Sequence, residues 1–271
     1  MVVGLLNKRF SIFLIAIFLG QSVSAAEFIG EFKQGSFILG KTELSSIVTI
    51  DDRKIRVSKE GYFVFGLSRD RKKNVVIKII KDGSSKIYKR EVIKRDYKIQ
   101  RIDGLPKKQV TPPKEVYDRI KKDNILIGKA RKIDSSLDFF KNKFTKPLDK
   151  AIITGVYGSQ RILNGKPRSP HFGLDYAANE GTPIKAMLSG VVTLAKNDLY
   201  YTGGTIIFDH GHGISTLYMH MKDVGVKIGQ RVKQGEVIGT VGQTGRSTGP
   251  HLDIRLNWFD VKLDPMSVLN D

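Results

Sequence analysis

The chain has 271 residues, 40% hydrophobic and 27% charged, a composition typical of an ordinary globular protein. It contains no cysteine, which excludes disulfide frameworks, thiol nucleophiles and cysteine-ligated zinc. The formal net charge is +19, and residues 27–150 carry most of it, with 32 basic and 17 acidic side chains. Such a surplus indicates either an anionic partner or a lysine-rich solvated surface. Nucleic acid is not the expected partner, because this half contains no recognisable nucleic-acid-binding motif.

The first 26 residues have the pattern of a secretory signal peptide. Lys8 and Arg9 precede an apolar run over residues 10–19, and small residues follow it up to Ala25 and Ala26. We expect cleavage after one of these two alanines and export to the periplasm or the cell envelope. A membrane span needs about 20 apolar residues, so we expect no stable transmembrane anchor.

Residues 27–100 are predicted to form a small, basic, antiparallel β-sandwich. Short apolar runs, several with turn residues at their ends, lie at residues 36–40, 47–52, 62–66, 74–80 and 86–88, a pattern typical of short strands. The pair Asp82-Gly83 predicts a hairpin between the last two of these runs. No candidate catalytic set is found here, so we interpret this part as a binding or spacer module.

Residues 101–150 are predicted to form a linker and a helical segment. Residues 101–113 end in Pro112-Pro113 and indicate an extended linker. From residue 114 to about residue 140, apolar residues recur near a 3.6-residue period, which predicts helix. Asn124 and Gly128 weaken the middle of this pattern, so two shorter helices are an alternative.

Residues 151–271 differ in composition from the part before them, with 17 of the 27 glycines between short β-rich runs. This pattern predicts a compact, mostly antiparallel β domain with tight glycine turns. All five histidines also fall between residues 171 and 251, so any metal site must be built from these histidines together with carboxylates.

Three short pieces of this domain combine residue types that suit metal chemistry. They are His171-x-x-x-Asp175, Tyr218-x-His220 and His251-x-Asp253. Side chains two apart in a strand point to the same face, and imidazole and carboxylate groups are both good zinc ligands. Each piece alone is a weak signal, because a lone histidine in a strand is more often a structural residue than a ligand, and it is their order that indicates a site.

In this order the three pieces resemble the lysostaphin/LytM-type zinc endopeptidases that cut peptidoglycan, and the resemblance runs from about residue 151 to residue 265. It implies a metallopeptidase domain with one zinc ion per chain, held by His171, Asp175 and Asp253. It also implies that His251 acts on the water that zinc activates, and that His220 polarises that water or stabilises the oxyanion. The implied substrate is peptidoglycan, cut at peptide cross-links or bridges.

The sequence departs from the family pattern at Asp253, because the usual third ligand is the second histidine of a His-x-His pair. An aspartate can bind zinc, but a second carboxylate makes the site more negative and the bound water less acidic. We therefore expect weaker or alkaline-shifted activity. The alternative function is a catalytically silent domain of the same fold that binds the wall or activates another wall hydrolase.

Other residues near these pieces allow simpler roles. His210 and His212 are expected to make structural hydrogen bonds at a turn. Tyr218 should share a strand face with His220, where it either lines a groove or packs in the core. Arg255 should share a face with Asp253 and either orient it or meet a substrate carboxylate. Arg246 lies in a glycine-flanked loop beside the expected site. Finally, the basic part before residue 150 is expected to hold the protein against anionic envelope polymers.

Overall fold

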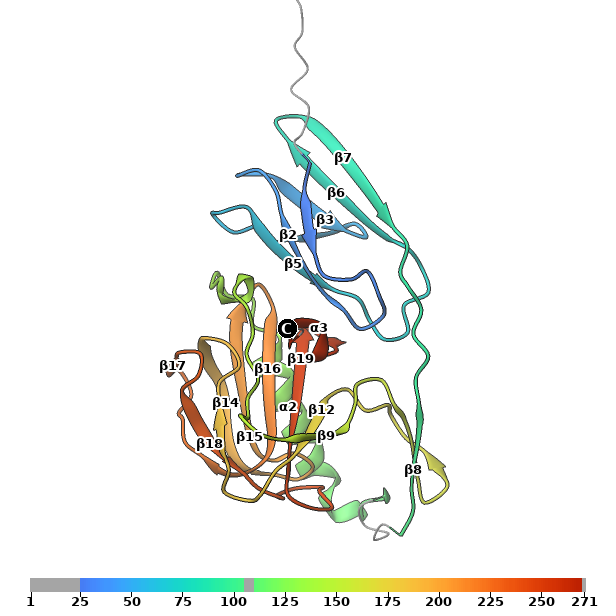
Figure 1. Ribbon diagram of the computed structural model, residues 1–271, viewed down its shortest axis with the longest axis vertical. Coiled ribbons are helices and arrows are strands. Elements are labelled where there is room, and N and C mark those ends of the chain that lie inside the picture. Colours follow the sequence, from blue (N-terminus) through green and yellow to red (C-terminus); the bar gives the residue numbers. More distant parts are fainter. Residues whose placement is uncertain (1–24, 105–109, 270–271) are drawn as a thin grey trace, which may run out of the picture.

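The computed structural model describes residues 25–104 and 110–269, in two β-rich parts that lie one above the other (Figure 1). Nearly all of the expected signal peptide, residues 1–26, and part of the expected linker fall outside these residues. Among the described helices, none has the length and apolar character needed to cross a membrane. The structure is mostly β, as predicted.

The N-terminal part consists of two antiparallel sheets that share a buried core. The first sheet contains β1 (Glu27–Ile29), β2 (Phe37–Lys41) and β5 (Tyr62–Gly66), and the second contains β3 (Ile47–Ile50), β4 (Arg53–Ile55), β6 (Val75–Lys81) and β7 (Ser84–Arg90). The predicted hairpin is confirmed, because Lys81 pairs with Ser84 across Asp82-Gly83.

A second hairpin in this part was not predicted. Asp51 and Asp52, which end one of the apolar runs noted in the sequence, have positive φ angles, 47° and 68°, and form the turn between β3 and β4. Short polar aspartate side chains tolerate this left-handed backbone better than other non-glycine residues do.

The connecting segment forms one strand and one principal helix. β8 (Ile99–Ile102) pairs in parallel with β10 (Gln160–Leu163) of the C-terminal part. A short 3-10 turn, η1 (Lys114–Val116), leads into α2 (Tyr117–Arg131), which continues through Asn124 and Gly128 without a break.

The helix prediction is correct up to residue 131 and wrong for residues 132–138. There the backbone makes tertiary bonds instead, since the Ser135 carbonyl accepts the His212 N–H at 3.1 Å. One further 3-10 turn, η2 (Phe139–Lys141), follows.

The C-terminal part is built on one large antiparallel sheet, as predicted. Its main path runs in the order β17-β14-β15-β16-β19-β12-β9. The strands of this sheet are β9 (Ile152–Gly155), β12 (Leu174–Ala177), β13 (Pro183–Lys185), β14 (Gly190–Leu199), β15 (Gly203–Gly211), β16 (Ile214–Val224), β17 (Arg231–Val232), β18 (Val237–Val241), β19 (His251–Trp258) and β20 (Val261–Leu263). Outside it, β11 (Lys166–Pro167) joins β10 and β8 in a small separate sheet, and α3 (Met266–Leu269) follows β20.

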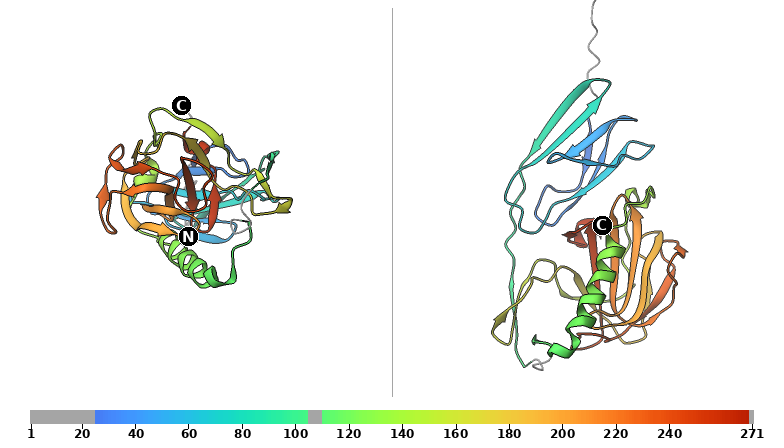
Figure 2. Two further views of the ribbon diagram at one scale, coloured as in Figure 1. Left: turned by 90° about the horizontal axis from the view of Figure 1, so that it is seen from below. Right: turned by 180° about the vertical axis from the view of Figure 1, so that it is seen from behind.

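Helix α2 covers one face of this sheet, as the view from behind shows (Figure 2). Ile127 and Ala130 of the helix pack against Leu194, Ile207 and Leu217 of β14, β15 and β16. The helix is therefore fixed to the domain by buried apolar contact rather than held loosely by a linker.

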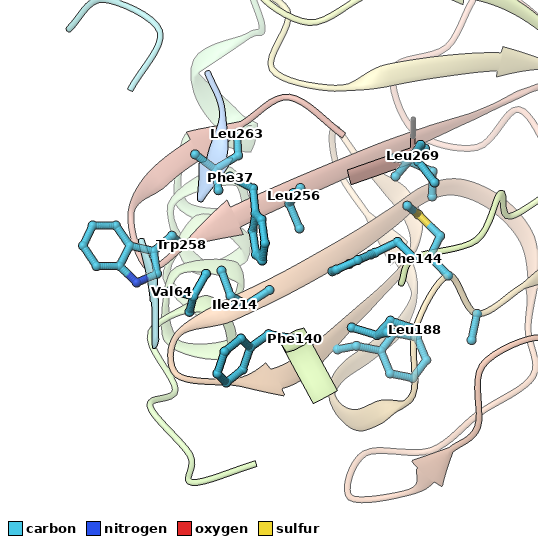
Figure 3. Close-up of a cluster of buried hydrophobic side chains, with 14 of the residues drawn as sticks. Phe37, Val64, Phe140, Phe144, Leu188, Ile214, Leu256, Trp258, Leu263 and Leu269 are labelled. Carbon is cyan, nitrogen blue, oxygen red and sulfur yellow. The ribbon is translucent and has the colours of Figure 1, made fainter. Parts of the chain in front are cut away.

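The buried cores of the two parts are continuous. Phe37 and Val64 of the N-terminal sandwich lie in one cluster with Leu256, Trp258 and Leu263 of the C-terminal part (Figure 3). An ion pair of 2.7 Å between Arg95 and Asp264 adds a polar link across the same junction. The change in composition near residue 150 is thus not a break in packing.

Candidate functional site

Two neighbouring strands and the loop before one of them bring the three expected metal ligands together. Asp175 on β12 and Asp253 on β19 are direct cross-strand partners, and His171 lies just before β12. One ligand atom from each residue lies within 4.8 Å of the other two. Nε2 of His171 is 3.1 Å from Oδ1 of Asp175 and 3.5 Å from Oδ2 of Asp253.

This cluster fits a zinc ion. Ligands about 2.1 Å from a tetrahedral ion lie roughly 3.4 Å from one another, close to the separations of the His171 and carboxylate atoms. Nε2 of His171 and Oδ1 of Asp175 are buried and make no hydrogen bond, although only 3.1 Å separates them. A buried polar atom without a partner is costly, and a shared cation would satisfy both atoms.

Two glycines make room for the carboxylates. A Cβ atom on Gly155 would lie 2.1 Å from Oδ2 of Asp175, and one on Gly173 would lie 2.1 Å from Oδ1 of Asp253. Neither glycine has a positive φ angle, so backbone conformation does not explain why glycine occupies these positions. We attribute the glycine at both positions to the space that the carboxylate groups occupy.

Two arginines compensate the negative charge of the cluster. Arg255 donates from Nη2 to Oδ2 of Asp253 at 2.9 Å and from Nε to Oδ1 at 3.3 Å. Nη2 of Arg161 lies 3.5 Å from Oδ2 of Asp175. Burial alone would raise the pKa of Asp253, but Arg255 and His171 outweigh it and hold that pKa well below its usual range. Of the two roles expected for Arg255, the structure shows the contact with Asp253.

His220 and His251 lie beside this cluster, with ring centroids 4.7 Å apart. Each ring donates a hydrogen bond from Nδ1 to a backbone carbonyl oxygen. The acceptor of His220 is Thr244 at 2.8 Å, and that of His251 is Gly249 at 2.9 Å. This contact identifies Nδ1 as the protonated nitrogen and leaves Nε2 of the neutral ring as an acceptor. Burial lowers the pKa of His220 to about 4, so this ring is neutral near pH 7.

The expected pairing of Tyr218 with His220 on one strand face is wrong. His220 has a positive φ of 63°, and the strand register shifts beside it. The local twist separates the two side chains, so that Tyr218 is fully buried while His220 lines the groove. The Tyr218 hydroxyl accepts the Met187 N–H at 2.8 Å, which makes it a core residue. A non-glycine residue held in this conformation is costly and recurs at functional sites.

His210 makes structural hydrogen bonds, as expected, but it lies within a strand, and of the two histidines only His212 occupies the expected turn. His210 lies within β15, where its ring bonds the Ser189 carbonyl and the Thr216 hydroxyl, both at 2.8 Å. His212 occupies the following turn with a φ of 51° and packs against Phe140. The structure therefore separates these two histidines from the metal-ligand cluster.

A groove of about 690 Å³ opens over the cluster and contains several residues that the sequence did not indicate. These are Gln100 of β8, Arg161 of β10 and Arg131 of α2, and Arg246, which the sequence placed beside the site, lines the groove as well. No local sequence signal marks Arg131 or Arg161, because only the tertiary fold brings β10 and α2 to this site.

Comparison with known proteins agrees with this geometry. Residues 169–265 match the profile of peptidase family M23. The DD-carboxypeptidase/endopeptidase Mpg of Neisseria meningitidis is 43% identical over 98 residues, which are 36% of this chain and 22% of that protein. The peptidoglycan DD-endopeptidase ShyA of Vibrio cholerae is 42% identical over 88 residues, 32% of this chain and 20% of that protein. The chain thus spans about a fifth of the length of these curated relatives.

One solved structure resembles nearly the whole chain. A Pseudomonas aeruginosa protein assigned to peptidase M23 has a TM-score of 0.67 and is 25% identical, and the alignment covers 88% of this chain and 95% of that one. The likeness therefore includes the N-terminal sandwich as well as the large sheet.

Proposed function

Because this chain carries a peptidase family M23 domain, we propose that it is an exported, zinc-dependent endopeptidase that hydrolyses peptide cross-links or bridges of peptidoglycan. The observation that carries the proposal is the convergence of His171, Asp175 and Asp253 beside two histidines that present acceptor nitrogens. The peptidoglycan endopeptidases among its relatives support the choice of substrate.

Zinc bound by His171, Asp175 and Asp253 would act as a Lewis acid that polarises the scissile carbonyl and acidifies a water molecule. Nε2 of His251 would take a proton from the attacking water and return it to the leaving amine. Ser247 supports this role, because its hydroxyl donates to the Gly249 carbonyl and leaves its oxygen to accept from Nδ1 of His251 at 3.1 Å.

His220 would orient the attacking water. Its Nδ1 donates to the Thr244 carbonyl, and its ring is neutral, so Nε2 can accept a hydrogen bond but has no proton to give an oxyanion. Of the two roles expected for His220 from the sequence, this geometry favours the action on water.

The arginines modify the expectation for Asp253. Two unpaired carboxylates would make the site strongly negative, but Arg255 and Arg161 each lie against one of them. We therefore expect a smaller alkaline shift of activity than two carboxylates alone would produce.

A catalytically silent domain is the second candidate, and the pairing of both Asp253 oxygens with Arg255 favours it. A carboxylate that is fully engaged by an arginine has less capacity to bind a metal ion. The two candidates differ in zinc content, because a silent domain need not hold stoichiometric metal.

The test is the zinc content of residues 27–271, measured for the wild type and for His171→Ala, followed by digestion of purified peptidoglycan. The proposal requires near one zinc per wild-type chain, almost none in the variant, and release of cleaved peptides by the wild type alone. Absence of zinc after incubation with the metal would select the silent wall-binding or activator domain.

Wall attachment is a separate part of the proposal. The surplus of positive charge in residues 27–150 would hold the exported protein in the periplasm or envelope against anionic polymers. Binding to isolated envelope material should then weaken steeply as salt is added, because the Debye length falls to about 3 Å at 1 M. Binding that does not change with salt would rule out this electrostatic attachment.

A further inference from the structure

The groove over the candidate metal centre has more positive than negative side chains. Two carboxylates line it, and both belong to the candidate ligands Asp175 and Asp253. Five cationic side chains line it as well: Arg131, Arg161, Arg246, Arg255 and Lys262. A metal ion in the site would increase this excess further, so the groove is suited to an anionic ligand.

Only some of these cations are used inside the protein. Arg255 forms a two-point contact with Asp253, and Arg161 contacts Asp175 and Gln100. Arg246 lies over the Tyr201 ring, with its guanidinium carbon 4.5 Å from the ring centroid. Within the described part of the chain, neither Arg131 nor Arg246 forms an ion pair with a carboxylate.

Arg131 is the most unusual of these cations. Its Nε atom is buried and has no hydrogen-bond partner among the described residues. Burial also lowers the pKa of this guanidinium, and the charge of Asp260 offsets this effect only in part. A buried donor without a partner is rare in a folded protein, and a bound acceptor would satisfy it.

Three of the arginines reach the groove from separate walls. Arg131 comes from α2, Arg161 from β10 and Arg246 from the loop between β18 and β19. A guanidinium is planar and forms paired hydrogen bonds that match a carboxylate. Convergence of three such groups beside His220 and His251 places anion recognition next to the bond to be cut.

We propose that Arg131, Arg161 and Arg246 form a subsite for free carboxylates that flank the scissile bond, so that the enzyme selects acidic peptide cross-links over uncharged bridges such as oligoglycine. This inference rests on the proposed endopeptidase function and specifies its substrate class. Stem peptides of peptidoglycan carry such carboxylates, whereas glycine bridges present only neutral amides.

The first experiment compares two cross-linked stem-peptide dimers that differ only in whether their side carboxylates are free or amidated. For the zinc-loaded full chain, we expect kcat/KM to be at least about tenfold higher for the free acid, mainly through KM. Arg131→Gln and Arg246→Gln should each remove most of this preference. Lys129→Gln is the matched control, because it removes an equal charge from an exposed position of α2 outside the groove.

The second experiment measures binding of the same two dimers to the chelator-treated full chain, in which cleavage is prevented. Tighter binding of the free acid, lost in Arg131→Gln, supports the subsite. Equal binding of both dimers, or faster cleavage of an oligoglycine peptide, overturns it even if the protein is an active peptidase. Selective binding without any cleavage by the zinc-loaded chain would instead overturn the proposed function and leave the subsite standing.

Discussion

Replacing Arg255 by methionine should destabilise the metal-free protein more than the zinc-loaded protein. The substitution keeps a long side chain but removes both hydrogen bonds to Asp253. The Asp253 side chain is 3% exposed, so its charge would be left almost without solvent. Removing one partner of a buried ion pair costs about 3–5 kcal/mol, and the 27% exposure of Arg255 places the expected loss near the lower end, about 3 kcal/mol.

Zinc should reduce this loss, because the metal ion replaces the missing positive charge beside Asp253. The free energy of unfolding is measured by urea titration, with chelator and with zinc. The fluorescence of Trp258 reports on the large sheet, since it is the sole tryptophan and ends β19. Arg255→Lys retains the charge without the two-point contact, and the exposed Arg231→Met controls for loss of surface charge.

Two results would refute this reasoning. Equal stability of Arg255→Met and the wild type in chelator would show that the ion pair does not stabilise the fold. A loss that is larger with zinc than with chelator would show that Arg255 acts by positioning the ligand, and not by balancing its charge.

Three further predictions concern the same domain. Gly173→Ala should weaken zinc affinity about tenfold or more in a chelator-competition titration, because its Cβ would displace Asp253, while Gly128→Ala on α2 has open space and should bind zinc normally. His220→Ala should lower kcat by about 10²–10⁴-fold with unchanged zinc content, and loss of zinc would identify His220 as a ligand instead. Acid should destabilise the chelated protein, because burial lowers the pKa of His210 from 6.5 to about 4 and the unfolded chain therefore binds more protons between these values. Stability should fall by about 1.4 kcal/mol per pH unit over this range for that residue, and a His210→Asn variant with the same slope in urea titrations would contradict the assignment.

The sequence was most informative where a property depends on neighbouring residues. The Asp82-Gly83 turn and the first part of the helix follow from local conformational preferences, and both lie where they were expected. The His171-x-x-x-Asp175 spacing also suggested ligands before their environment was known. That environment depends on strand pairing, because Asp253 meets Asp175 only through the register of β12 and β19.

Other features required the folded chain. Alternation along a strand predicted that Tyr218 and His220 share a face, and the left-handed backbone at His220 reverses this expectation. Arg131 and Arg161 belong to elements that are remote in sequence from the ligands, and nothing in their local pattern distinguishes them from surface arginines. The helix prediction past residue 131 failed for a related reason, since tertiary hydrogen bonds at Ser135 replace helical ones.

The parallel pairing of β8 with β10 also restricts how this protein can be recombined. The chain leaving the N-terminal sandwich supplies Gln100 to the groove, and α2 supplies Arg131 before the large sheet begins. A gene fusion that transferred only residues 151–271 to another partner would discard both walls and expose the apolar surface that Phe37 and Val64 cover. Residues 151–271 therefore do not form a self-sufficient unit, and a functional transfer should include the N-terminal part and the connecting segment as well.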